Sequence, residues 1–399
     1  MSEKELFEAD IQAMFEQTIA WRRHLHQYPE LSHEEYKTAN YIEAVIRSID
    51  EHLEVERLLP TTLQVKLTGQ HPGKRILFRA DIDALAVLEQ TGLPFASLNP
   101  GVMHACGHDG HIAILLSVLA ILVNYRDKLY GEIVFVFQAA EEVGGARELI
   151  KTNFLATIEE AYALHLWPEF EVGKYQLASG PIMAAGCWFR IKIIGKGGHA
   201  GRPHQTVDPI NASLDLIASI KAQLNRKIDP LITHTFSITY LQSGEATNVI
   251  PSDLTFGGTI RTLNQVALLE IRAIISQTLE SYAKLYGFDF EAEFEIDGLG
   301  KDDAPSAPLI NDEKLVKQLR EKLQANYGNV VEPFTPTLAG EDFSFYGLKV
   351  PVVFTFVGAA PSDETFSLHH PQFDIDETAL IWGVRLFLTR ALTMIGEKN

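Results

Sequence analysis

Short apolar runs alternate with helical segments along most of this chain, and this alternation restricts its fold more than any other feature. The runs have the length of buried strands, and the segments between them have helical spacing. Strands that alternate with helices form a largely parallel sheet with helices on its faces. The predicted strands are 63–68, 75–83, 131–140, 160–166 and 351–358, and the predicted helices are 7–27, 30–49, 312–326, 375–395 and two that begin near 108 and 144.

The pattern changes near residue 185, where apolar and polar residues begin to alternate as in half-buried strands. The predicted strands here are 188–194, 234–243, 253–262 and 288–297, with helices at 207–227 and 265–286. Their order is βαββαβ, which is typical of a ferredoxin-like domain. A chain of 399 residues is long enough for two domains. We therefore predict an α/β fold in which 1–183 and 299–399 form a domain with a mixed, largely parallel sheet flanked by helices, and 184–298 form an inserted ferredoxin-like domain.

Composition excludes several classes of protein. The net charge of −18 argues against a nucleic-acid partner. Cys106 and Cys187 are the only cysteines, so a disulfide framework is excluded and a cytoplasmic location is expected. The charged N-terminus lacks the apolar segment of a signal peptide. The longest apolar run, 112–123, is shorter than the ~20 residues of a membrane span, so we expect a buried helix and no membrane partner.

Histidine and carboxylate groups follow three of the predicted strands. Asp81 and Asp83 end one strand, the pair Glu141 and Glu142 follows another, and His165 ends a third. Ligands of open α/β sheets bind outside the carboxyl ends of the strands, so these groups are expected to gather at one edge.

The stretch "HACGHDGH" (104–111) adds a thiol and imidazoles. A thiolate, imidazoles and a carboxylate suit Zn²⁺ or another divalent ion. Taken alone, Cys106 and His108 are better explained as a buried small residue and a residue near a helix start. No second paired cluster indicates a zinc finger, and there is no Cys-x-x-Cys redox motif.

Glu141 and Glu142 could divide the work of a hydrolytic site, or they could lie in a solvated loop. One carboxylate would bind the metal and the other would act as a general base. A divalent ion lowers the pKa of a bound water to roughly 7, which makes a nucleophile at neutral pH.

Motifs along nearly the whole chain resemble those of peptidase family M20. They are "RRHLHQYPELSHEE" (22–35), "RADIDAL" (79–85), "HACGHDGH" (104–111), "QAAEEVGGA" (138–146), "HLWP" (165–168), "GKGGHAGRPH" (195–204), "ATNVIP" (246–251), "GTIRT" (258–262), "GEDFSFY" (340–346) and "LHHP" (368–371). The chain is most similar to the amidohydrolase subgroup, which includes hippurate hydrolase, N-acyl-L-amino acid amidohydrolases, N-acetyldiaminopimelate deacetylase and plant auxin-conjugate hydrolases. This resemblance implies a catalytic α/β domain with an inserted ferredoxin-like lid.

The resemblance also implies a site with two divalent metal ions per chain, Zn or Mn, with Ni and Co as alternatives. Glu141 would be the general base, and Asp83 would orient the site. Asp81 stands where other branches have a histidine ligand and is not assigned to the metal. The implied ligands are Cys106, His108, Glu142, His165 and His369. His370 is the alternative to His369, which aligns better.

In the lid, the resemblance implies that His199 reaches the active site of a partner chain, where it stabilises the developing oxyanion. Asn248 and Arg261 would hold the substrate carboxylate, a role that suits the two-pronged guanidinium. Without the resemblance, His199 would be a surface loop residue and Arg261 an exposed strand residue. We expect a homodimer through the lid domain, because pairing would cover an exposed edge strand.

The predicted activity is metal-dependent hydrolysis of the amide bond of small N-acyl amino acids, of the N-acetyl or N-benzoyl type, to a carboxylic acid and a free amino acid. The alternatives are an N-acetyldiaminopimelate deacetylase, a dipeptidase of the same fold, and a non-catalytic binding protein. A binding protein would be expected to have lost Glu141 or several ligands, and all of them are present.

Overall fold

The computed structural model describes residues 5–295, 307–361 and 364–396. The chain forms two compact units, each with its own hydrophobic core. The predicted domain boundary at 298–299 and the last two residues of the strand predicted at 288–297 lie outside the described residues. Unit 1 comprises Met1–Gly180, Ile310–Thr335 and Phe345–Asn399, and unit 2 comprises Pro181–Leu309 and Pro336–Ser344.

Within its described residues, unit 1 is built on an eight-stranded sheet with the order β1-β2-β4-β3-β5-β16-β6-β15. The pairs β3–β4, β3–β5 and β5–β16 at its centre are parallel, whereas β1–β2, β2–β4 and β6–β16 are antiparallel. The predicted mixed, largely parallel sheet is therefore confirmed. The strands are β1 (Val55–Arg57), β2 (Leu63–Thr68), β3 (His71–Asp81), β4 (Tyr130–Gln138), β5 (Glu160–Trp167), β6 (Tyr175–Gln176), β15 (Val331–Glu332) and β16 (Val352–Gly358).

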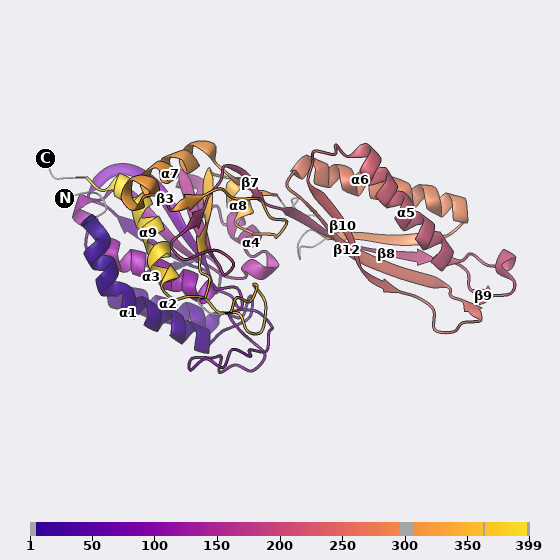
Figure 1. The fold of residues 1–399 in the computed structure, drawn as a ribbon, viewed down its shortest axis with the longest axis horizontal. Coiled ribbons are helices and arrows are strands. Elements are labelled where there is room, and N and C mark those ends of the chain that lie inside the picture. The colour runs from indigo at the N-terminus through magenta and orange to yellow at the C-terminus, as the bar shows by residue number, and fades with distance from the viewer. Residues whose placement is uncertain (1–4, 296–306, 362–363, 397–399) are drawn as a thin grey trace. The chain divides into compact units, whose positions relative to one another are not determined.

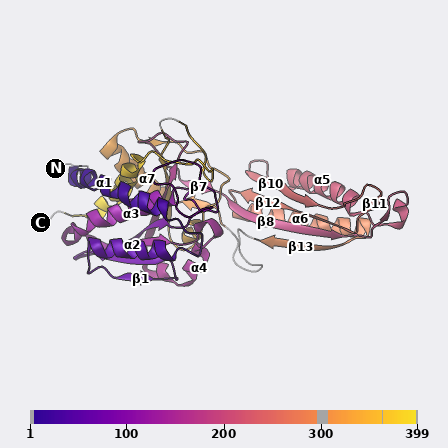
Figure 2. The same cartoon turned by 90° about the horizontal axis from the view of Figure 1, so that it is seen from below.

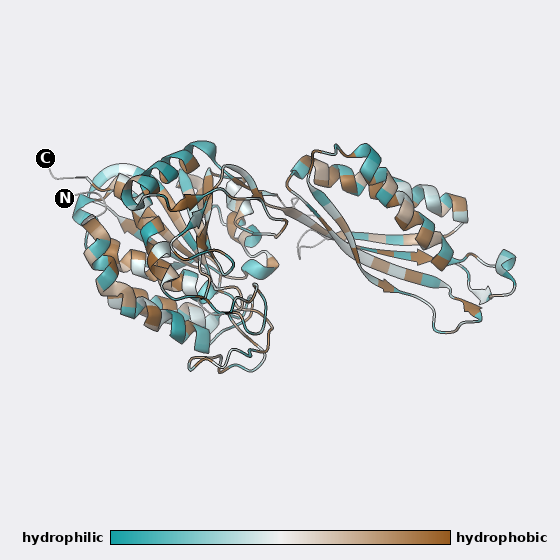
Figure 3. Cartoon of the chain, in the orientation of Figure 1, coloured by the Kyte–Doolittle hydropathy of each residue, from teal (hydrophilic) through white to brown (hydrophobic). Residues whose placement is uncertain are grey.

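Helix α3 (His108–Val123) lies at the centre of the helical layer, packed against α1 (Glu5–Gln27) and α9 (Ala379–Ala391) (Figures 1 and 2). All of its residues up to Leu122 are buried, as expected of an apolar helix inside a protein core. Helix α1 is amphipathic, with hydrophilic and hydrophobic residues in turn along its length (Figure 3). The other helices of unit 1 are α2 (Tyr36–Ile49), α4 (Ala146–Lys151) and α7 (Glu313–Tyr327).

Helix α2 begins at Tyr36, six residues later than the helix predicted from residue 30. His33 has a φ of 67°, which interrupts a helix, and Leu31 forms an isolated parallel bridge with Ala84. The Glu30 carboxylate accepts hydrogen bonds from the backbone N–H (2.8 Å) and the hydroxyl (3.0 Å) of Thr38. These bonds satisfy a backbone amide in the first turn of α2 that has no partner within the helix. Residues 30–35 therefore form a turn rather than a helix.

Unit 2 contains an antiparallel sheet with the order β10-β12-β8-β13. Helices α5 and α6 pack on one face of this sheet and bury its apolar side chains (Figure 1). The main elements follow the order βαββαβ, with a short β9–β11 pair in addition. They are β8 (Ala185–Ile194), β9 (Gly198–His199), α5 (Pro209–Lys227), β10 (His234–Gln242), β11 (Val249–Ile250), β12 (Asp253–Thr262), α6 (Gln265–Tyr286) and β13 (Asp289–Glu295). Strands β7 (Gly180–Met183) and β14 (Leu309–Asn311) and the short helix α8 (Ser344–Gly347) occur where the chain passes from one unit to the other.

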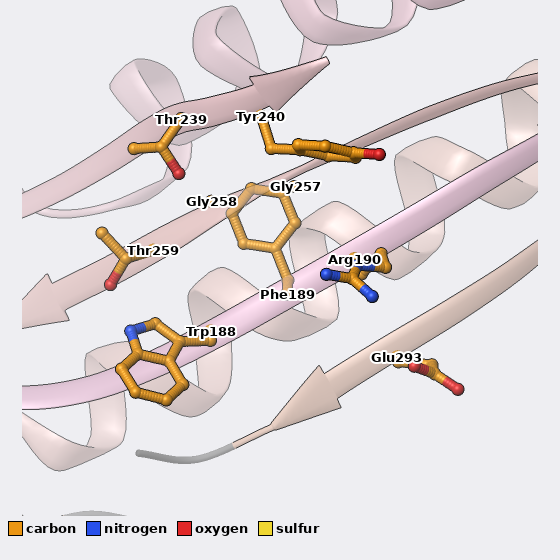
Figure 4. A pocket seen from close by; sticks show the side chains of 9 residues that line it. All are labelled: Trp188, Phe189, Arg190, Thr239, Tyr240, Gly257, Gly258, Thr259 and Glu293. Carbon is orange, nitrogen blue, oxygen red and sulfur yellow. The ribbon is translucent and has the colours of Figure 1, made fainter. Parts of the chain in front are cut away.

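The opposite face of the unit 2 sheet contains a hollow (Figure 4). In register across the strands, Tyr240 pairs with Gly257, Gly257 with Arg190, and Arg190 with Glu293. Gly257 has no side chain, so the hollow opens above it, and the exposed ring of Trp188 lies on its border. The guanidinium carbon of Arg190 lies 5.7 Å from the centre of the Tyr240 ring.

Candidate metal centre

The candidate ligands of unit 1 come from strand ends and from two loops. Because β3, β4 and β5 are parallel, their carboxyl ends meet at one edge of the sheet. Strand β5 supplies His165, and the short 3-10 turn Glu141–Val143 after β4 supplies Glu141 and Glu142. Cys106 and His108 flank Gly107, whose φ of 84° turns the chain into α3. His369 lies in a second loop, where its backbone N–H donates to the carbonyl of Ala105 (2.8 Å).

The structure brings the five predicted metal ligands together in overlapping groups. In each group, the atoms that could bind a metal lie within 4.8 Å of one another. Cys106, His108 and Glu142 each belong to two of these groups, so the groups join into one cluster. The groups are Cys106 with His108 and His165, Cys106 with Glu142 and His369, and His108 with Glu141 and Glu142.

Hydrogen bonds leave the Nε2 atoms of two histidines facing this cluster. His108 Nδ1 lies 3.0 Å from the carbonyl of Asp83, so it donates there, and the buried Nε2 has no hydrogen-bond partner among the described residues. His165 Nδ1 likewise donates to the carbonyl of Leu166 (2.8 Å), which leaves Nε2 as an acceptor 3.4 Å from Cys106 Sγ.

Glu142 contributes a further buried acceptor. Its Oε1 lies 3.4 Å from His369 Nε2 and has no hydrogen-bond partner within the described part of the chain. Buried polar atoms are rarely left without a partner, and imidazole, thiolate and carboxylate are together a donor set for a divalent ion. The residues present therefore fit a metal centre.

Asp81, His108 and His111 form another close group, but hydrogen bonds already occupy two of its members. His111 Nδ1 lies 2.6 Å from Asp81 Oδ1, and His111 Nε2 accepts the backbone N–H of Leu166 (2.9 Å). Asp81 Oδ2 accepts from Arg79 Nη1 (2.6 Å). The His111 ring therefore has no lone pair left for a metal ion, and its bond to the Leu166 N–H ties it to β5.

Asp83 contacts both His108 and the turn that contains Glu142. Its Oδ1 lies 3.4 Å from His108 Nδ1, and its Oδ2 accepts hydrogen bonds from the backbone N–H of Glu142 (3.1 Å) and the hydroxyl of Ser32 (2.7 Å). One buried carboxylate thus orients the His108 ring and fixes the backbone of the Glu142 turn.

Electrostatics in the metal-free protein favour protons on two of these groups. Burial lowers the pKa of His108, but the carboxylates of Asp81 and Asp83 outweigh it and raise the pKa to about 10. Burial and the nearby carboxylates of Glu142 and Glu141 hold the pKa of the Cys106 thiol well above its usual range. Burial and neighbouring histidines lower the pKa of His165, which is neutral.

His369 and His370 differ in their surroundings. His369 has a φ of 68°, and its ring approaches Glu142 as described above. His370 stacks on Phe366 with ring centres 4.7 Å apart, and its Nδ1 accepts the backbone N–H of Gln372 (3.1 Å). His370 belongs to none of the candidate ligand groups in the described residues.

The three predicted site residues of unit 2 lie in two places. His199 and Asn248 are both exposed at the β9–β11 pair, where the carbonyl of Asn248 accepts the backbone N–H of Ala200 (3.1 Å). Arg261 is half-buried on β12 and, because side chains alternate along a strand, shares the sheet face of Gly257. The structure thus brings His199 and Asn248 together within unit 2 and holds Arg261 on a different strand.

Sequence reasoning passed over one buried carboxylate beside this cluster. Glu35 is fully buried and accepts a hydrogen bond from the backbone of Ala140, the residue before Glu141. It lies inside the motif "RRHLHQYPELSHEE", but nothing in the sequence pattern distinguishes it from its exposed neighbour Glu34.

The chain belongs to the peptidase family M20/M25/M40, whose family model matches residues 77–392. It is 37% identical over 374 residues to an N-acetyl-L-cysteine deacetylase of Bacillus subtilis (strain 168), covering 93% of this chain and 86% of the relative. It is 40% identical over 279 residues to an N-acyl-L-amino acid amidohydrolase of Geobacillus stearothermophilus, covering 69% of this chain and 75% of the relative. The predicted family and the enzyme class, a hydrolase that acts on amides, are thereby confirmed.

One similar crystal structure is that of a Bacillus subtilis protein described as a dinuclear metal binding peptidase of the M20 family. It matches with a TM-score of 0.82 at 31% identity and covers 96% of this chain and 99% of that chain. Among the described residues of our chain, no helix is long and apolar enough to cross a membrane.

Proposed function

We propose that this chain hydrolyses the amide bond of N-acyl amino acids with the help of two divalent metal ions. The observation that carries this proposal is the cluster of five candidate ligands, which fall into overlapping groups with a buried thiol among them. The relatives named as an N-acyl-L-amino acid amidohydrolase and an N-acetyl-L-cysteine deacetylase support the substrate class. The dinuclear relative supports the number of ions.

In this proposal, five residues divide between two ions, and His369 rather than His370 is the fifth ligand. Cys106 would serve both ions, because it belongs to a group with His108 and His165 and to another with Glu142 and His369. When bound, the ions would polarise the acyl carbonyl and make water a nucleophile at neutral pH, and Zn²⁺, Mn²⁺, Ni²⁺ and Co²⁺ all suit this donor set. The ligands are Cys106, His108, Glu142, His165 and His369.

Glu141 acts as the general base in this scheme. It adjoins the ligand Glu142 in the same 3-10 turn, and its carboxylate lies within 4.8 Å of ligand atoms of His108 and Glu142. It takes the proton from the attacking water and delivers it to the leaving amine, so that the products are a carboxylic acid and a free amino acid.

Three residues of unit 2 complete the proposal. Arg261 and Asn248 would bind the carboxylate of the amino acid, and His199 would donate a hydrogen bond to the oxyanion in the active site of a partner chain. A twofold homodimer through unit 2, the lid domain, would be required for this, and the exposed edge strand β10 supports such pairing. The two free cysteines agree with a cytoplasmic location.

A substrate panel tests the proposal. Metal-free protein is loaded with Zn²⁺, Mn²⁺, Ni²⁺ or Co²⁺ and assayed for amine release from N-acetyl-, N-benzoyl- and longer N-acyl amino acids, N-acetylcysteine among them. We expect hydrolysis that requires metal and a free carboxylate, with the corresponding amino-acid amides turned over much more slowly. Metal-loaded protein that hydrolyses dipeptides but no N-acyl amino acid would contradict the proposed substrate class.

A further inference from the structure

A single carboxylate oxygen accepts hydrogen bonds from two turns of unit 1 that lie far apart in the sequence. Glu35 Oε1 accepts the backbone N–H of His33 (2.9 Å) and the backbone N–H of Ala140 (2.8 Å), which lies 105 residues away. Glu35 Oε2 accepts the hydroxyl of Thr61 (2.9 Å). The Glu35 side chain is fully buried, so these three donors supply the hydrogen bonds that water would give to an exposed carboxylate.

Both backbone donors have a left-handed conformation without being glycine. The φ angles are 67° for His33 and 60° for Ala140. Such residues cost free energy and persist only where their surroundings impose the conformation. Both amides donate to a carboxylate, and such charge-assisted hydrogen bonds are stronger than ordinary backbone hydrogen bonds. Glu35 therefore stabilises both turns at the same time.

The conformation of Ala140 determines where the side chain of Glu141, the proposed general base, lies. Ala140 immediately precedes the 3-10 turn of Glu141 and Glu142, and its carbonyl accepts the backbone N–H of Gly145 (2.7 Å). The bond from Glu142 N–H to Asp83 holds the far side of the same turn. A change of φ at Ala140 would swing Glu141 and Glu142 together, so the turn needs an anchor at both ends.

We propose that Glu35 is a positioning residue for the general base: it holds Ala140 in the left-handed conformation that directs Glu141 toward its substrate and Glu142 toward the metal. The role rests on the proposed function for Glu141. Among the described residues, the Glu35 carboxylate bonds only to backbone and to Thr61, and it acts on the reaction through the Ala140 turn.

The test compares Glu35→Ala, Glu35→Gln and a matched control, Glu30→Ala. Glutamine can accept both backbone N–H bonds through Oε1 and can donate to the Thr61 hydroxyl, so it keeps the geometry without the charge. Glu30 is a carboxylate of the same segment that also accepts two hydrogen bonds, but both come from Thr38 and neither reaches the Ala140 turn. Its loss measures the effect of destabilising the segment alone.

For Glu35→Ala at saturating metal we expect kcat to fall about 100-fold with little change in KM, as for a misplacement of about 1 Å. Metal affinity should fall about 10- to 100-fold, as when a residue that supports a ligand is removed. Amide hydrogen exchange in residues 139–145 should become faster. Glu35→Gln should stay within a few-fold of the unaltered protein in all three measurements, and Glu30→Ala should leave kcat unchanged.

Unchanged kcat and unchanged amide hydrogen exchange in Glu35→Ala would overturn the proposal. Equal losses of kcat in Glu35→Ala and Glu35→Gln would also overturn it, because the geometry alone should suffice. An equal loss of kcat in Glu30→Ala would show that destabilising the segment explains the effect. If Glu35→Ala does not fold, Thr61→Val replaces it, because it removes only the bond to Oε2. That variant should show a smaller loss of kcat and faster exchange at 139–145, and unaltered values would again contradict the proposal. If the unaltered protein hydrolyses no N-acyl amino acid, the proposed function fails, whereas hydrogen exchange and metal affinity still decide the role of Glu35.

Discussion

Metal binding by this protein should depend steeply on pH, because two candidate ligands hold protons in the metal-free state. The pKa of His108 is about 10 despite its burial, and the pKa of the Cys106 thiol is raised well above its usual range. An ion that binds His108 as neutral imidazole and Cys106 as thiolate must therefore displace two protons. Both pKa values lie above neutral pH, so affinity rises as the pH rises toward them.

The expected magnitude follows from the number of protons. Each displaced proton makes binding about tenfold weaker per unit of falling pH, or about 1.4 kcal/mol. Two protons predict about a 100-fold loss of affinity between pH 7.5 and pH 6.5. His108→Gln should reduce this dependence to about tenfold, because only the thiol then releases a proton. His165→Gln is the matched control: burial keeps His165 neutral, so the variant should bind metal more weakly but keep the full pH dependence.

Competition with a chromogenic chelator at pH 6.5, 7.0 and 7.5 measures the affinity, and calorimetry in buffers of different ionisation enthalpy counts the released protons. The reasoning is refuted if affinity changes by less than about tenfold per pH unit or if fewer than one proton is released. An identical slope in His108→Gln and the unaltered protein would show that His108 is not a protonated ligand.

Three further predictions concern catalysis, stability and assembly. Glu141→Gln should lower kcat by about 10²- to 10⁴-fold with metal content unchanged, whereas Glu142→Gln should lose metal; equal metal loss in both would contradict their separate roles. Burial lowers the pKa of His26, but hydrogen bonds to Asp109 and Glu89 raise it to about 9. Compared with a pKa of 6.5 in the unfolded chain, the raised pKa stabilises the folded protein by about 3 kcal/mol. This contribution is complete below pH 6.5 and is lost as the pH rises through 9. Urea unfolding should show this loss in the unaltered protein and not in His26→Gln. Mixing Glu141→Gln with His199→Ala should restore activity after subunit exchange, because one site of the heterodimer carries neither defect; exchange without recovery would place His199 in its own chain or outside the mechanism.

The sequence predicted the sheet, and it predicted that polar groups after the strands lie close together, because both features depend on local patterns. Buried apolar strands between helices indicate a largely parallel sheet, and the groups that follow such strands gather at one edge, as Glu142 and His165 do. His369 lies in a loop without helical or strand periodicity, so only the family motif indicated it as a candidate ligand.

The network beneath the ligands could not be predicted, because its contacts join residues far apart in the chain. Glu35 meets Ala140 across 105 residues, and the helical spacing of residues 30–49 concealed the turn in which Glu35 lies. The pairing of His111 with Asp81 is a similar case, since the two residues lie 30 positions apart in the chain. Such contacts depend on three-dimensional packing, which short sequence patterns do not encode.

The most direct test of the metal centre is anomalous diffraction from crystals of protein loaded with Zn²⁺ or Mn²⁺. We predict two ions about 3.5–4 Å apart, with the sulfur of Cys106 bound to both and His165 and Glu142 on different ions. Ions bound by Asp81 and His111, with Cys106 outside their coordination, would contradict the account.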